Sequence, residues 1–219
     1  MSAPKTVFIN ARLCIDGQLV NGKTLTISDG KIASIESAPL ATDTSSEEVI
    51  DLEGFILSPG FIEIQTNGLR GFHFTHFDDE ASYSQKLEEV ARYLPQTGVT
   101  GFYPTIPTVH SDELKKVCHP PLTPPSPPYC GASILGAHAE GPYLHPSKKG
   151  AHNASLFHLP STSPLEIYGP TALTNRTLKL VTLAPELPDT TALIHDLTSK
   201  GIRVSLGHSI ATYPKASPP

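Results

Sequence analysis

The segment Ala132–Leu144 reads Ala-Ser-Ile-Leu-Gly-Ala-His-Ala-Glu-Gly-Pro-Tyr-Leu. Its first five residues form a short apolar run with small side chains, which predicts a buried parallel strand. His138 and Glu140 then fall at the carboxyl end of that strand, where α/β folds place their chemistry, and at a spacing that projects both side chains from one face. A carboxylate beside one or two imidazoles outlines a metal site, although a lone Glu at a strand end is more often simply solvated.

Working outward from this segment, apolar runs alternate with amphipathic ones. The expected strands are 61–67, 98–104, 132–140, 178–184 and 202–208, and the expected helices are 81–94, 111–117 and 189–200. The first helix places Tyr83, Leu87, Val90, Ala91 and Leu94 on one face. Ser111 and Gly201 are predicted as an N-cap and a C-cap. Strands alternating with helices predict a parallel sheet with helical crossovers.

The first part of the chain has a different pattern. Residues 24–28 and 31–36 alternate polar and apolar side chains around Asp29-Gly30, which predicts a hairpin. Residues 49–52 and 55–57 flank Glu53-Gly54 in the same manner, and 37–48 should be a surface loop. We therefore expect two domains, a small β domain over 1–57 and an α/β domain over 58–219.

Composition narrows the class of protein. A formal net charge of -5 argues against nucleic acid or an anionic membrane as the main partner, and no apolar run is long enough to be a signal peptide or a membrane span. Cys14, Cys118 and Cys130 show no CxxC spacing, so neither a disulfide framework nor a zinc knuckle is indicated. We expect a cytoplasmic protein. The proline-rich segment 119–128 is expected to be a stiff surface connection or, less simply, a ligand for an SH3-type groove.

A second potential ligand stands at another strand end. His208 closes the run Leu206-Gly207-His208-Ser209, and parallel strands bring their carboxyl ends to one edge of a sheet. A lone His there is more often a hydrogen-bonded structural residue, but its convergence with Glu140 favours a metal-dependent hydrolase. His152, on the loop after Glu140, is placed to orient a polar or anionic substrate.

Several motifs together resemble those of the N-acetylglucosamine-6-phosphate deacetylase family of the amidohydrolase superfamily. They are Ser58–Gly68, His138–Leu144, Lys148–Asn153, Val181–Glu186 and Ser205–Ser209, in the family's order and spacing. The resemblance implies a small β-sandwich joined to an amidohydrolase-type (β/α)8 TIM barrel. Residues 1–57 would then be the N-terminal part of the sandwich, and the five strands would be the first five of the eight in the barrel.

Position by position, the resemblance implies that Glu140 and His208 are metal ligands and that Ala151 and His152 contact the sugar. Gln65 and Asn67 stand where many amidohydrolases have a His-x-His pair. Neutral amides are poor ligands for transition ions, so the resemblance implies one divalent ion, Zn²⁺. It also implies hydrolysis of N-acetylglucosamine 6-phosphate to acetate and glucosamine 6-phosphate, with a small-molecule amino-sugar phosphate as partner and a homo-oligomer as the assembly the family allows.

The chain also departs from the family pattern. The family's second histidine ligand and the aspartate that acts as general base correspond to positions beyond residue 219, so no catalytic residue is assigned within the chain. We therefore expect the chain as given to be a C-terminally truncated family member without activity of its own. Two alternatives are a noncatalytic fragment that binds sugar or a full-length partner, and a different amidohydrolase acting on another amide.

Overall fold

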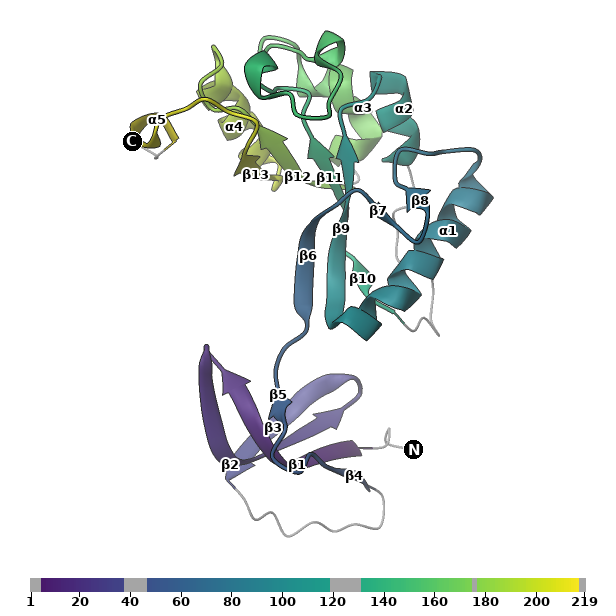
Figure 1. Cartoon of the computed structure of the whole chain (residues 1–219), viewed down its shortest axis with the longest axis vertical. Helices are drawn as coiled ribbons and strands as arrows, with labels where there is room; N and C mark the ends of the chain where they lie inside the picture. Colours follow the sequence, from purple (N-terminus) through teal and green to yellow (C-terminus); the bar gives the residue numbers. More distant parts are fainter. Residues whose placement is uncertain (1–4, 38–46, 119–130, 175–176, 217–219) are drawn as a thin grey trace. The chain divides into compact units, whose positions relative to one another are not determined.

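The computed structural model describes residues 5–37, 47–118, 131–174 and 177–216. The chain divides into two compact units, Met1–Pro59 and Gly60–Pro219 (Figure 1). The boundary expected from the sequence lies two residues earlier. Three features of the sequence analysis lie outside the described residues. They are positions 38–46 of the expected surface loop, the proline-rich connection and Cys130.

The first unit is a five-stranded sheet in the order β3-β2-β1-β4, with β5 also paired to β1. Its strands are β1 (Lys5–Ile15), β2 (Gln18–Ser28), β3 (Lys31–Ser37), β4 (Glu47–Asp51) and β5 (Ile56–Leu57). The hairpin predicted at Asp29-Gly30 is confirmed, because Ser28 faces Lys31 in an antiparallel register. Asp16-Gly17 makes a second two-residue hairpin, between β1 and β2, that the sequence analysis did not single out.

The prediction of a hairpin at Glu53-Gly54 is wrong. β4 and β5 do not pair with each other, and both run parallel to β1 along the same edge. Glu53 and Gly54 have positive φ values of 49° and 86°, and the turn is closed by the bond from Phe55 N to Leu52 O at 2.7 Å. The chain then returns to β1, where Arg12 N donates to Phe55 O at 3.0 Å. β4 and β5 both pair with the same edge of β1, so the chain keeps its direction through the turn instead of reversing.

The second unit is built on a curled parallel sheet in the order β10-β9-β11-β12-β13, with β6 paired to β9 (Figure 1). Its strands are β6 (Phe61–Thr66), β9 (Val99–Pro107), β10 (Ser133–Ile134), β11 (Ala137–Glu140), β12 (Leu178–Leu183) and β13 (Arg203–Leu206). A separate two-stranded ribbon consists of β7 (Gly68–Leu69) and β8 (Phe72–His73). The predicted parallel sheet is confirmed, but the strand predicted over 132–140 is split into β10 and β11 at Gly136, whose φ is 117°.

Helices follow the parallel strands along the chain. They are α1 (Glu80–Tyr93), α2 (Ser111–Val117), α3 (Pro164–Thr174), α4 (Thr190–Ser199) and α5 (Tyr213–Ala216), with short 3-10 turns η1 (Leu94–Thr97), η3 (Pro146–Lys148) and η4 (Ala154–Leu156). All five apolar side chains predicted to share one face of the first helix are buried. They join the core formed between the sheet and the helices, which also contains Phe102, Ile106, Ala139 and Val181.

Three details of the helices differ from the prediction. The C-cap of α4 is Lys200 and not Gly201, which follows it with a φ of 76°. The N-cap of α2 is His110 and not Ser111, which is already the first helical residue. Helix α3 was not predicted, because Gly169 and Pro170 interrupt its pattern. Gly169 has a φ of 78°, and α3 is kinked at this point.

The alternation of side chains along the strands positions the functional face. Ala137 and Ala139 of β11 belong to the core under the helices, so His138 and Glu140 project from the opposite face of the sheet. On the neighbouring strands, Thr105 and Thr182 share that face and contact His138. The interior of the curled sheet is therefore polar at the level of β11.

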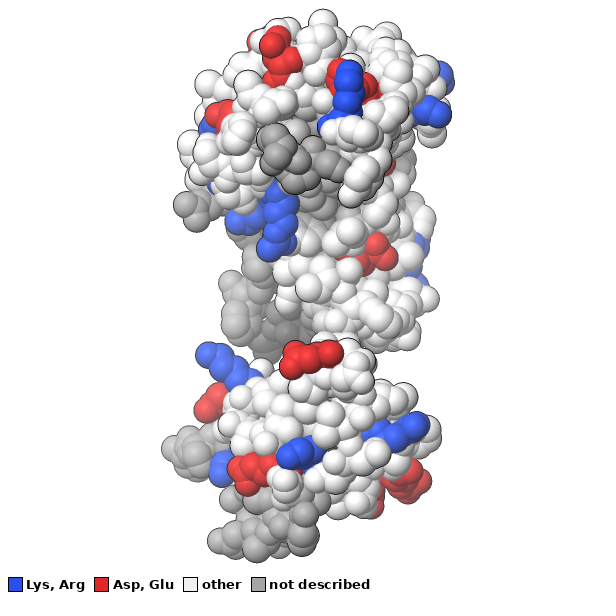
Figure 2. Space-filling model, turned by 90° about the vertical axis from the view of Figure 1, so that its left-hand side faces the viewer, with Lys and Arg blue, Asp and Glu red and all other residues white. Residues whose placement is uncertain are grey.

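Within the parts of the chain that the structure describes, no helix combines the length and apolar character needed to cross a membrane. On the face shown in Figure 2, Lys and Arg side chains stand singly or in small groups among Asp and Glu. Cys14 and Cys118 are free thiols, and Cys118 is buried.

Candidate metal centre

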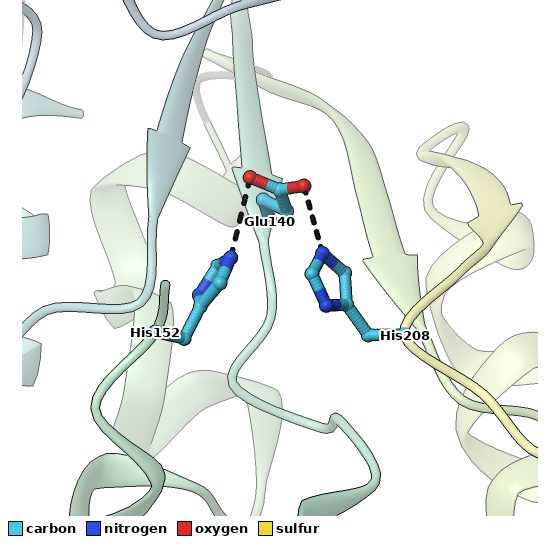
Figure 3. A group of neighbouring side chains, drawn as sticks. All are labelled: Glu140, His152 and His208. Carbon is cyan, nitrogen blue, oxygen red and sulfur yellow. Dashed lines mark hydrogen bonds and ion pairs between the residues drawn. The ribbon is translucent and has the colours of Figure 1, made fainter. Parts of the chain in front are cut away.

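Glu140, His152 and His208 form a cluster at the carboxyl ends of the parallel strands (Figure 3). One ligand atom from each residue can be chosen such that all three lie within 4.8 Å of one another. Nε2 of His208 is 3.1 Å from Oε1 of Glu140, and Nε2 of His152 is 3.4 Å from Oε2. Each carboxylate oxygen therefore faces its own imidazole, and the two rings lie side by side with their centroids 4.7 Å apart (Figure 3).

Glu140 is the last residue of β11 and is fixed by its own backbone. Its carbonyl oxygen accepts a hydrogen bond from Thr108 Oγ1 at 3.0 Å, and Gly141 N donates to Thr182 O at 3.0 Å. The hydrogen bond from His152 lowers the pKa of Glu140 to about 2, opposed by partial burial and assisted by His208 in the form that carries a proton on Nε2. Glu140 is thus an ionised carboxylate across the physiological pH range.

In its neutral form, His208 presents an unprotonated nitrogen to that carboxylate. Its Nδ1 lies 2.7 Å from the carbonyl oxygen of Lys148, which can only accept, so Nδ1 carries the proton. In the neutral ring, Nε2 then has a lone pair that faces the anionic oxygen of Glu140. Two acceptors in contact need a proton or a cation between them, and a metal-ligating histidine is typically held through its other nitrogen in this way.

His152 has the opposite tautomer. Its Nδ1 accepts a hydrogen bond from the backbone N–H of Thr108 at 3.2 Å, so in the neutral ring the proton is on Nε2. Nε2 therefore donates toward Oε2 of Glu140. His152 is buried, and a turn in which its N–H donates to Lys149 O at 3.0 Å holds it in place. The two histidines thus differ in chemistry: one offers a lone pair and the other a donor.

The donor set fits a divalent transition ion. One carboxylate oxygen and an imidazole nitrogen with a free lone pair are ligands that Zn²⁺ accepts, and structural or catalytic zinc sites use three or four such groups. Glu140 and His208 would hold the ion. The proton on Nε2 of His152 keeps that nitrogen from being a third ligand in the tautomer described.

The cluster opens into a cavity of about 520 Å³, within the usual size of small-molecule sites. Its lining consists of Asn67, His73, Pro107, Thr108, Glu140, Ala151, His152, Asn153 and His208. The structure therefore brings all four predicted site residues together: Glu140, Ala151, His152 and His208. Of the amide pair on the first strand, Asn67 lines this cavity, whereas Gln65 borders a neighbouring depression.

His73 is a cavity residue that the sequence analysis missed. It closes the β7–β8 ribbon, and its Nδ1 lies 2.8 Å from Thr75 Oγ1. No motif marks it in the sequence, because the ribbon brings it beside Asn67 only through tertiary structure.

His138, which lies on the same face as Glu140, is not part of the cluster. Its Nδ1 donates to Ile64 O at 2.8 Å, and its Nε2 accepts from Thr182 Oγ1 at 2.7 Å. Burial lowers the pKa of His138 below its ordinary value of 6.5, which favours the neutral ring. With both nitrogens bonded, His138 links β6, β11 and β12 beneath the cluster.

This chain has a curled parallel sheet, with carboxylate and imidazole donors at the carboxyl ends of its strands. The arrangement is that of the predicted amidohydrolase type of fold. No model of a known protein family matches the chain. Over 217 residues, however, it is 38% identical to N-acetylglucosamine-6-phosphate deacetylase from Rattus norvegicus, an alignment that covers 95% of this chain and 50% of the rat enzyme. The predicted resemblance to the N-acetylglucosamine-6-phosphate deacetylases is therefore confirmed.

Solved structures agree with this relationship. The N-acetylglucosamine-6-phosphate deacetylase from Pasteurella multocida has a TM-score of 0.77 and 32% identity, covering 97% of this chain and 53% of that one. A variant of the Mycobacterium smegmatis deacetylase in complex with N-acetyl-D-glucosamine-6-phosphate shares the fold, with a TM-score of 0.73, 21% identity and coverage of 98% and 52%. The chain spans about half the length of the curated relatives it matches.

Proposed function

We propose that this chain carries the metal-binding and substrate-binding part of a deacetylase for N-acetylglucosamine 6-phosphate. The observation that carries the proposal is the pairing of Glu140 with the lone-pair nitrogen of His208 at a cavity of ligand size. A divalent cation held by these two residues, Zn²⁺ in our proposal, supplies Lewis-acid polarisation of an amide carbonyl and lowers the pKa of water. The similarity to named deacetylases supports the choice of substrate.

The remaining cavity residues would bind and orient the sugar. The Nε2 proton of His152 faces Glu140, and once a bound cation engages that carboxylate the same N–H can donate to an oxygen of the substrate. Ala151 precedes it on the cavity wall, where its small side chain leaves room for the ligand. Asn67 and His73 add polar groups to the wall. These residues position the acetamide, and they do not replace a general base.

Proton transfer needs a group that these residues do not supply. Of the described residues that line the cavity, only Glu140 carries a carboxylate. As the proposed metal ligand, that carboxylate is not free to accept a proton. Nδ1 of His73 and Nδ1 of His152 each accept a backbone N–H, so in the neutral rings their Nε2 atoms already carry a proton. We therefore propose that residues 1–219 bind metal and amino-sugar phosphate but release acetate only with a further carboxylate. The proposed compartment is the cytoplasm, where sugar phosphates occur.

The test measures metal and sugar binding separately from turnover. Zn²⁺ affinity is measured by equilibrium dialysis for residues 1–219, for Glu140→Gln and for Glu89→Gln, a control on the exposed face of α1. Titration calorimetry then compares N-acetylglucosamine 6-phosphate with glucosamine 6-phosphate, which lacks the acetamide. We expect Glu140→Gln alone to lose Zn²⁺, and we expect the acetylated sugar to bind the metal-loaded protein more tightly.

Unchanged Zn²⁺ affinity in Glu140→Gln would refute the metal site. Equal affinity for the two sugars would refute recognition of the acetamide. Acetate released by residues 1–219 in a reaction that requires Glu140 would show that the described residues suffice for catalysis, against our proposal that a further carboxylate is needed.

A further inference from the structure

His208 adopts a backbone conformation that is uncommon for a residue with a side chain. Its φ is 50°, in the left-handed region, although it is not a glycine. Such a conformation persists only where the surrounding structure enforces it, and it recurs at functional sites. Here it turns the chain at the end of β13 so that the imidazole points at Glu140 (Figure 3). The residues on either side of His208 must therefore be held.

The residues before and at His208 are held by main-chain bonds. Gly207 N donates to Leu183 O at 3.0 Å, which continues the pairing of β13 with β12. The carbonyl oxygen of His208 accepts from His145 N at 3.0 Å. These bonds fix one side of the turn and leave the segment that follows it to be fixed by something else.

That segment is held by the side chain of Glu186. Its Oε2 accepts a hydrogen bond from Ser209 Oγ at 2.7 Å, and its Oε1 accepts one from the backbone N–H of Ile210 at 2.7 Å. Glu186 lies three residues beyond the end of β12, the strand beside β13. Both sides of His208 are thus tied to one strand and the turn that follows it. Glu186 is not among the residues that line the candidate metal cavity.

We propose that Glu186 is a positioning residue for the metal site. Its two hydrogen bonds to Ser209 and Ile210 hold His208 in the left-handed conformation that directs Nε2 toward Glu140. The inference rests on the metal site proposed above and assigns Glu186 a mechanical role that does not depend on its charge. Residues that orient metal ligands typically change metal affinity by about ten- to a hundredfold when they are removed.

Three substitutions separate this role from an electrostatic one. Glu186→Ala removes both acceptors. Glu186→Gln keeps an oxygen for Ile210 N–H and offers an amide to Ser209 Oγ, so it retains the bonds without the charge. Ser209→Ala removes one bond and leaves Glu186 intact. Glu89→Ala, on the exposed face of α1, is the matched control.

Zn²⁺ affinity and the visible absorption spectrum of the Co²⁺-loaded protein are measured for each variant of residues 1–219. Glu186→Ala should bind Zn²⁺ about ten- to a hundredfold more weakly, with an altered Co²⁺ spectrum, because the ligand is no longer held. Glu186→Gln should remain within about threefold of the parent, since neutral hydrogen bonds suffice for the clamp. Ser209→Ala should fall between them.

A Zn²⁺ affinity of Glu186→Ala equal to that of the parent would overturn the inference. So would a Zn²⁺ affinity of Glu186→Gln as weak as that of Glu186→Ala, because it would indicate that the charge of Glu186 matters. If circular dichroism shows that Glu186→Ala does not fold, Ser209→Ala decides the question through the same two measurements. Glu140→Gln is run in parallel. Zn²⁺ affinity unchanged in that variant would count against the metal site itself, whereas affinity lost there but kept in Glu186→Ala would count only against the clamp.

Discussion

Nε2 of His208 lies 3.1 Å from Oε1 of Glu140, although 68 positions separate the two residues in sequence. The contact arises because β11 and β13 lie on either side of β12 in one parallel sheet, with Glu140 opposite Thr182 and Leu206 opposite Leu183. Parallel strands end at the same edge, so residues that follow them meet. A shift of register by one residue would turn Glu140 to the other face and abolish the cluster.

Replacement of His208 should remove most of the bound Zn²⁺. His208→Ala deletes the only ring nitrogen in the cluster whose lone pair faces Glu140 in the tautomers described above, so one carboxylate would remain to hold the ion. Metal content of the folded protein is measured by elemental analysis after dialysis. His195→Ala, on the exposed side of α4, serves as the control and should keep its metal. Retention of Zn²⁺ by His208→Ala would contradict the assignment.

Replacement of His152 should weaken sugar binding and leave the metal in place. Its Nδ1 accepts from Thr108 N–H, so its other nitrogen is a donor and not a ligand. His152→Ala should retain Zn²⁺ and lose about tenfold in affinity for N-acetylglucosamine 6-phosphate, the equivalent of about one hydrogen bond. Calorimetry on the metal-loaded protein gives the affinity. Simultaneous loss of metal would instead place His152 among the ligands.

His138 should matter for stability. His138→Leu leaves the carbonyl of Ile64 and the hydroxyl of Thr182 without their buried partner. We expect the free energy of unfolding to fall by about 2 to 3 kcal/mol, the cost of unsatisfied buried polar groups. Urea unfolding in the presence of EDTA measures this effect without the metal. The matched substitution His195→Leu, at an exposed position, should change the free energy of unfolding by less than about 0.5 kcal/mol.

Asp79 should make the stability of the second unit depend on pH through the first turn of α1. Hydrogen bonds from the Ser82 hydroxyl and backbone lower the pKa of Asp79 below its ordinary value of 3.8. Because the folded-state pKa is the lower one, the capping contribution is complete above the unfolded value and is lost as pH falls through the folded value. Asp79→Ala should lower the melting temperature at pH 7, and the difference from the parent should shrink below about pH 4.

Thermal melts of Asp79→Ala and of Asp79→Asn, measured from pH 7 to pH 3, provide the check. Asn can cap the helix without a charge, so the melting temperature of Asp79→Asn should stay close to that of the parent at pH 7. The cap in Asp79→Asn should not weaken as the pH falls. A difference between Asp79→Ala and the parent that stays constant with pH would contradict the capping role.

Much of the second unit follows from local pattern. Apolar side chains recur at helical spacing from Tyr83 in α1 to Leu94, the first residue of η1, and the strands are short apolar runs. The same regularity places Glu140 and His208 at strand ends, which is why both could be proposed as ligands from the sequence. The loop position of His152 already indicated a contact with substrate, and the resemblance of several motifs in order added Ala151, which no periodicity would have marked.

Local pattern failed where two partners compete for one segment. The run around Glu53-Gly54 has the composition of a hairpin, yet β4 and β5 both pair with β1, because pairing along an existing edge satisfies the same backbone groups. Helix α3 escaped prediction because Gly169 and Pro170 carry strong local signals against a helix. The backbone follows those signals at Gly169, where it is not helical, and the helical segments on either side pack into the core through Ile167 and Ala172.

The chemical identity of each histidine was decided only by tertiary structure. His138, His152 and His208 are equivalent as letters in the sequence. The carbonyl of Lys148 gives His208 a free lone pair, the N–H of Thr108 gives His152 a proton toward Glu140, and Ile64 with Thr182 engages both nitrogens of His138. The sequence specifies which side chains reach the carboxyl ends of the strands, because strand period is local. Which ring nitrogen carries the proton depends on hydrogen-bond partners far away in the chain, and those exist only in the folded protein.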